Sequence, residues 1–158
     1  MAHIVTAPEY SRELEDGVNV FLAGGITNCP DWQSPIVDKL KTLTPINIFN
    51  PRRNNWNPTF SEEDECLKQI NWEYDHLRIS DVVIFWFPKE TLCPITLLEY
   101  GKFLVSNKRM VVGVHPEYQR KLDIKIQTTL ERPYQEIVHS IDGIFQKFFE
   151  IFNEGFPI

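Results

Sequence analysis

The sequence predicts an α/β fold: a doubly wound, mainly parallel sheet of five strands with helices on both faces. Short apolar runs alternate with longer segments whose apolar residues recur at helical spacing, which is the order of β-α-β units. One run, residues 82–87, is apolar throughout, as is typical of a strand buried on both faces of a parallel sheet. Residues 18–158 are expected to form one domain, and residues 1–17 a polar lead-in that pairs loosely or frays.

The first half of the domain is expected to hold two strands and one helix. Residues 18–23 form a mainly apolar run that ends at a pair of glycines, which indicates a buried strand and a tight turn. Residues 31–43 carry apolar side chains at helical spacing. Residues 46–49 give the second strand, which ends before Pro51 because proline cannot donate a ladder hydrogen bond.

The next helix is predicted at residues 61–79, where Ser61 offers a capping hydroxyl and acidic residues fill the first turn. The apolar strand 82–87 follows it. Pro94 suits the first position of a further helix, over residues 94–106.

The last third is predicted to supply two more strands and a long helix. Residues 110–114 form an apolar run, and residues 122–130 alternate apolar and polar side chains, which favours a fifth strand. The helix is expected over residues 134–153.

Composition favours a small ligand over a polymer. The net charge of −6 disfavours nucleic acid as a partner, because phosphate backbones are bound by clustered Lys and Arg. No stretch approaches the roughly 20 apolar residues of a membrane span. The three cysteines, Cys29, Cys66 and Cys93, lack disulfide or metal spacing, so we expect reduced thiols, a cytoplasmic location and no metal or redox cofactor.

Glu99 is the first candidate for chemistry. Ligands bind beyond the carboxyl ends of parallel strands, and this residue lies in the helix after the third strand. Its neighbours four residues away, Ile95 and Phe103, are apolar, so this row should face the sheet. A carboxylate there costs several kcal/mol unless it is partnered or solvated. The alternative is an edge position directed to water. Gly101 is expected to let this helix approach its neighbours.

Glu73 is the second candidate, because Ile70 and Leu77 flank it at helical spacing. Asp75 lies further from the apolar stripe expected on this helix, and we keep it as a substrate-binding candidate. The stripe consists of Cys66, Ile70, Tyr74 and Leu77. Two carboxylates at one sheet edge supply the nucleophile and proton donor that glycosidic chemistry needs. The alternative for each is a solvated acidic face.

Three loops supply the binding candidates. The backbone of Gly24 and Gly25 can approach a ligand closely. A sugar hydroxyl, base or phosphate can bind at the polar loop after the second strand, although such loops are often only solvated; its candidates are Asn50, Arg52 and Arg53. Trp86 and Phe87 can stack on a base at the end of the third strand, and the alternative for them is a core role.

Five segments together resemble the nucleoside 2-deoxyribosyltransferase superfamily over roughly residues 18–115. They are Phe-Leu-Ala-Gly-Gly-Ile at 21–26, Asn-Pro-Arg-Arg at 50–53, Trp-Glu at 72–73, Ser-Asp-Val-Val-Ile-Phe-Trp-Phe-Pro at 80–88 and Leu-Leu-Glu-Tyr-Gly-Lys at 97–102. Their order and spacing are more specific than any one segment.

The resemblance implies a flavodoxin-like (Rossmann-like) fold and a retaining double displacement in which Glu99 attacks C1′ of the sugar. The family's acid lies eight residues before the Asp that opens the next strand. Since Asp81 opens it here, this acid corresponds to Glu73, which would protonate or orient the leaving base. Glu replaces the usual Asp at this position, and Phe21, a substrate-binding candidate, stands where the transferases have Tyr.

Three functions remain open. The first is base exchange between 2′-deoxynucleosides, with a nucleoside or nucleotide and a free nucleobase as partners. The second is hydrolysis of a nucleoside or nucleoside monophosphate by the same residues, and the third is a non-catalytic nucleotide-binding module. The resemblance also implies a homo-oligomer. An interface or simple packing on the sheet would account for the apolar C-terminal helix, with its Ile144, Phe145, Phe148, Phe149 and Phe152.

Overall fold

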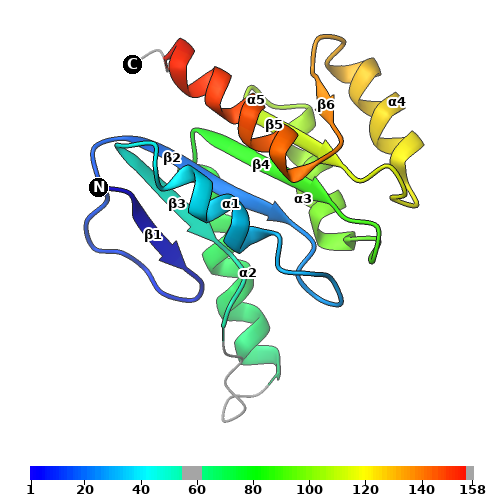
Figure 1. The fold of residues 1–158 in the computed structure, drawn as a ribbon. Coiled ribbons are helices and arrows are strands. Elements are labelled where there is room, and N and C mark those ends of the chain that lie inside the picture. Colours follow the sequence, from blue (N-terminus) through cyan, green and yellow to red (C-terminus); the bar gives the residue numbers. More distant parts are fainter. Residues whose placement is uncertain (55–61, 156–158) are drawn as a thin grey trace.

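The computed structural model describes residues 1–54 and 62–155, and within them six strands form one sheet. Every neighbouring pair is parallel, in the order β1-β3-β2-β4-β5-β6 (Figure 1). The strands are β1 (His3–Thr6), β2 (Val18–Gly24), β3 (Ile46–Asn50), β4 (Val82–Phe87), β5 (Arg109–Val114) and β6 (Ile137–Val138). The predicted doubly wound parallel sheet is confirmed, with six strands where five were expected.

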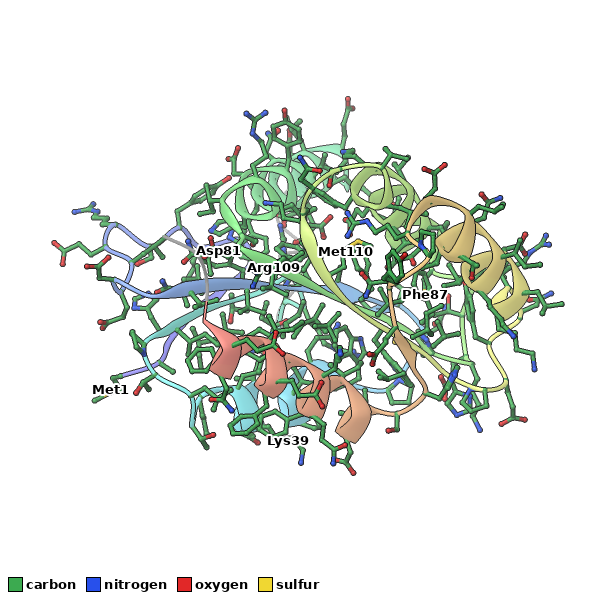
Figure 2. All side chains as sticks on the ribbon, turned by 90° about the horizontal axis from the view of Figure 1, so that it is seen from above. Met1, Lys39, Asp81, Phe87, Arg109 and Met110 are labelled. Atoms are coloured by element: carbon green, nitrogen blue, oxygen red, sulfur yellow. The ribbon has the colours of Figure 1, made fainter. Side chains whose placement is uncertain are left out.

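Two layers of helices enclose this sheet. On one face lie α1 (Gln33–Leu40) and α5 (Ile141–Glu154), and on the other lie α2 (Glu62–Ile79), α3 (Pro94–Leu104) and α4 (Lys121–Glu131). Figure 2 shows the two layers edge-on, with Lys39 of α1 beside α5, where it pairs with Asp142 at 3.1 Å. The expectation of helices on both faces is therefore confirmed.

The core is divided by the sheet into two apolar layers. β4 is buried along its whole length, and its side chains alternate between the layers. Phe85 and Phe87 pack on the side of α2, α3 and α4, whereas Ile84 and Trp86 pack on the side of α1 and α5. A strand used on both faces must be apolar throughout, which explains its sequence.

The expected strand within residues 122–130 is wrong, because this segment is α4. Ile124 and Thr128, four residues apart, are buried, whereas Ile126 between them is 55% exposed. Burial thus follows the helical period rather than the alternation of a strand. The sequence pattern of this short segment is compatible with a helix and with a strand.

The C-terminal helix begins at Ile141, not at residue 134 as expected. Residues 137–138 pair with β5 as the last strand, so they cover its open edge. Ser140 then caps α5 by accepting a hydrogen bond from the Gly143 amide at 2.9 Å. Ile144 and Phe148 of α5 are fully buried in the chain's own core, and Phe149 is 43% exposed.

The N-terminal lead-in also takes part in the sheet, because β1 pairs with β3 at its edge. Further along this segment, the Trp72 indole donates to the Glu9 carbonyl at 2.6 Å and ties residues 7–17 to α2. Ser61, the expected cap of α2, lies outside the described residues.

Candidate functional site

The order of the strands creates a switch point between β2 and β4. The chain moves from β2 outward to β3 and then crosses to β4 on the other side of β2, so the connections after β2 and β4 diverge. At such a switch point the carboxyl ends of two strands open onto a crevice. A pocket of about 540 Å³ lies here, on the face covered by α2 and α3.

The pocket unites six of the residues singled out in the sequence. They are Phe21, Gly24, Gly25, Arg53, Glu73 and Glu99. They come from β2 and its following turn, the loop after β3, and helices α2 and α3. Residues far apart in the chain therefore meet at one sheet edge.

Glu99 occupies the inner face of α3 beside Thr96 and Tyr100, and it is 9% exposed. Glu99 borders the pocket, and the influences on its carboxyl within the described residues are burial and two charges, with no hydrogen bond among them. Burial, and then the negative charge of Glu73, raise the pKa of this carboxyl to about 8, against a smaller opposing effect of Lys102. The protonated form of Glu99 is therefore favoured at neutral pH.

Glu73, on α2, lines the same pocket. The pKa of its carboxyl is raised, because the effect of burial outweighs the hydrogen bond from Gln69 and the charge of Arg53, which both lower it. The Gln69 amide donates to Glu73 Oε1 at 2.8 Å. The two carboxyls thus differ, because one has a donor that stabilises its charge and the other has none.

The turn after β2 brings backbone to the pocket. A Cβ on Gly25 would stand 2.9 Å from the Cys29 sulfur and 3.2 Å from the Cys93 sulfur, so only glycine fits without displacing a neighbour. The Gly25 carbonyl accepts hydrogen bonds from the Trp32 indole at 2.9 Å and the Gln33 amide at 3.2 Å. This pocket wall is therefore fixed by Trp32, which precedes α1, and by Gln33, the first residue of α1.

Arg52 and Asn50 shape the site from outside the pocket. Arg52 donates to the carbonyls of Cys29 and Pro30 and to the Gln33 side chain, at 3.0, 3.1 and 3.0 Å. The Asn50 side chain accepts from the Arg52 amide at 3.0 Å. Both predicted binding residues are thus engaged in holding the turn that follows β2.

Three other predicted binding residues also lie away from the pocket. Trp86 faces the α1 and α5 layer because it alternates with its strand neighbours. Phe87 is fully buried between Tyr100 and Tyr118. Asp75 accepts a hydrogen bond from the Tyr10 hydroxyl at 2.8 Å, on the exposed side of α2. Their placement is that of structural residues.

The inward face of α2 differs from the stripe expected in the sequence. Of that stripe only Leu77 is buried, and Ile70 is 61% exposed at the pocket mouth. The buried residues of this helix are Glu65, Trp72, His76 and Leu77. Gln69 was not among the candidates, although the polar row Glu65, Gln69 and Glu73 at four-residue spacing is a signal that could have revealed it.

The comparisons with known proteins show the family and support the fold. Fold and site define an α/β protein with a two-carboxyl pocket at the switch point of a parallel sheet. The profile of the family described as "Nucleoside 2-deoxyribosyltransferase like" matches residues 17–118, and the chain belongs to this family. None of the curated proteins matches the sequence.

A solved structure supports the fold. The crystal structure of a conserved protein from Enterococcus faecalis V583 has a TM-score of 0.62 at 12% sequence identity, over 85% of this chain and 98% of that chain. Together with the family, this likeness confirms the flavodoxin-like architecture.

Two further features are absent from the described residues. No described helix has the length and apolar character needed to cross a membrane. Within residues 1–54 and 62–155, no three His, Cys, Asp or Glu side chains are grouped as metal ligands.

Proposed function

We propose that this chain cleaves the N-glycosidic bond of a 2′-deoxynucleoside and passes the sugar to a second nucleobase through a covalent glycosyl-enzyme on Glu99. The observation that carries the proposal is the pair of carboxyls, Glu73 and Glu99, in one pocket at the switch point. Retaining glycosyl chemistry needs one carboxyl as nucleophile and a second group to move a proton. Membership of the family supports nucleoside glycosyl chemistry in general.

The protonation of the pair fits this reaction. The pKa values of both carboxyls are raised, that of Glu99 to about 8, as in a coupled pair that retains one proton. In the proposed reaction this proton starts on Glu99. Glu73 takes the proton from Glu99 and delivers it to the departing base nitrogen. The freed Glu99 carboxylate forms a bond to C1′ as the C1′–N bond breaks, and the bonding electrons leave with the base. The incoming base reverses these steps.

The pocket supports a nucleoside as the ligand. Its volume of about 540 Å³ lies within the usual range of roughly 300–1,000 Å³ for small-molecule sites. Phe21, Ile70 and Ile95 provide apolar wall for a base. Arg53 in the wall pairs with the buried Glu65 and donates to Gln69, so its guanidinium is already engaged by side chains of the protein. We therefore favour a nucleoside over a nucleoside monophosphate.

A product assay tests the proposal and separates the alternatives. A 2′-deoxynucleoside is incubated with and without a second free base, and products are resolved by chromatography. Transfer gives a new nucleoside only when the second base is present, whereas hydrolysis gives free base and sugar in both. We expect transfer, its loss in Glu99→Gln, and its retention in Glu150→Gln, an exposed glutamate of α5. Binding without turnover would contradict the proposal.

We also propose that the chain works in the cytoplasm, where its three free cysteines stay reduced.

We further propose that the chain self-associates. Apolar side chains that are at least half exposed lie on α2 and α3, and two of them, Ile70 and Ile95, line the pocket. This surface supports an interface more strongly than α5 does. These side chains are Leu67, Ile70, Tyr74, Ile95 and Leu98. Sedimentation at micromolar concentration measures the assembly, and a monomer there would contradict it.

A further inference from the structure

Four side chains form a continuous row of polar contacts from the first turn of α2 to the pocket. Glu65 is 2% exposed and pairs with the Arg53 guanidinium, whose side chain is 6% exposed. The Arg53 Nε donates to the Gln69 side-chain oxygen at 2.6 Å. Gln69 Nε2 then donates to the Pro51 carbonyl at 2.9 Å and to Glu73 Oε1 at 2.8 Å. The row ends on a carboxyl that lines the pocket.

The polarity of this row is set by its donors. A guanidinium can only donate, so the Gln69 oxygen must face Arg53. Both hydrogens of the Gln69 amide nitrogen are consequently directed to acceptors, the Pro51 carbonyl and the Glu73 carboxylate. Turning the amide over would face its single oxygen toward these two acceptors and its NH₂ group toward the Arg53 donor. The amide is therefore locked in the orientation that donates to Glu73.

A donor locked in this way favours the ionised form of the group that accepts from it. Glu99 has no such donor among the described residues and lies in the same pocket. Four other ionisable groups of the described residues lie near the two carboxyls or their partners. Lys68 pairs with Glu65 at 3.8 Å, Lys102 acts on Glu99 from α3, and the Cys66 and Cys93 thiols line the wall.

We propose that Gln69, oriented by Arg53, is a positioning residue that fixes the negative charge of the pocket on Glu73 and leaves the proton on Glu99. This inference rests on the proposed function for its purpose, because Glu73 must be ionised to accept the proton that the leaving base needs. The distribution of the proton is itself a property of the empty pocket and can be measured without any turnover.

The test is a titration by NMR of protein labelled with ¹³C at the glutamate carboxyls, with the two signals assigned from Glu73→Gln and Glu99→Gln. In the native chain we expect Glu73 to ionise before Glu99 as the pH rises. In Gln69→Met the ionisation of Glu73 should shift upward by about one pH unit. Gln69→Asn keeps an amide but is one methylene too short to bridge, and it should shift in the same direction. Gln127→Met, an exposed glutamine on α4, is the matched control.

Kinetics supply the second readout. With the donor removed, kcat should fall roughly tenfold or more while KM stays near the native value, and the acid limb of the pH profile should move upward. Unchanged titration of both carboxyls in Gln69→Met and Gln69→Asn would overturn the positioning role even if the native chain transfers sugars. A shifted titration in a chain without glycosyl activity would instead uphold the positioning role and contradict the proposed function.

Discussion

Glu73 faces the same pocket as Glu99, and its negative charge adds to the effect of burial in raising the pKa of the Glu99 carboxyl to about 8. Two carboxyls in one pocket cannot both ionise easily, so at neutral pH the pair retains a proton. A site arranged for proton transfer is consequently a site that reduces the stability of the fold when it is fully charged.

Replacing Glu99 by Gln should stabilise the protein at alkaline pH. The pKa of this group is raised on folding from its ordinary 4.5 to about 8, so its contribution to stability is full below pH 4.5 and is lost as pH rises to 8. An uncharged amide has no such loss. At pH 8.5 we expect the free energy of unfolding of Glu99→Gln to exceed that of the native chain by roughly 2–4 kcal/mol. At pH 4.5 the two free energies should differ much less.

Urea unfolding of both proteins at the two pH values measures this effect, and Glu150→Gln serves as the control for an exposed site. An equal stability difference at both pH values would show that Glu99 is ionised in the folded protein without loss of stability. This result would contradict a pair of carboxyls that retains one proton at neutral pH.

Arg132 is predicted to be a main stabiliser of the connection between α3 and β5. Its guanidinium donates to the carbonyls of Phe103, Leu104, Ser106 and Lys108 at the end of that helix. Arg132→Ala leaves these acceptors without their donor, so we expect a loss of about 2–4 kcal/mol in the free energy of unfolding. Arg120→Ala is the matched control, since Arg120 is exposed and forms one surface ion pair.

Two glycines should respond in opposite ways to a methyl group. A Cβ on Gly24 would meet the Trp32 ring at 2.5 Å and the Trp86 carbonyl at 2.6 Å, so Gly24→Ala should cost about 1–3 kcal/mol and distort the pocket wall. A Cβ on Gly101 meets nothing within 4 Å, so the close approach expected there is wrong. Gly101→Ala should therefore stabilise α3 by about 0.5–1 kcal/mol, as thermal unfolding would measure. Destabilisation by Gly101→Ala would contradict this.

Most of the sheet could be predicted from sequence because its strands are strongly apolar and bounded by Gly, Pro or Asn. Residues 82–87 show this best, since no other structure would bury six consecutive apolar side chains so well. The errors lie where local pattern is ambiguous. Residues 122–130 fit both periods, and β6 exists because β5 has an open edge, which no local signal encodes.

The candidate site was predictable in part for a related reason. Glu99 could be identified because it lies on α3, the helix that follows the switch-point strand. The apolar row used to orient it is not inward, because Ile95 is 59% exposed. The buried residues beside Glu99 are Thr96 and Tyr100. Glu73 also lies in the pocket, although the stripe used to orient α2 is exposed. This helix turns a polar row toward the pocket and shows apolar side chains outside, so hydrophobic phase alone gives the wrong face. Arg52 and Trp86 could not be separated from pocket residues without knowing which sheet face the pocket occupies.

The central claim is that the Glu99 carboxylate forms a bond to the sugar. The most direct measurement is mass spectrometry after mixing the protein with a 2′-deoxy-2′-fluoronucleoside, whose fluorine disfavours the oxocarbenium-like transition state and slows release of the sugar. We predict a mass increase of one fluorosugar on the peptide that contains Glu99, absent in Glu99→Gln and present in Glu150→Gln. Base release with an adduct on another residue, or undiminished activity in Glu99→Gln, would contradict the account.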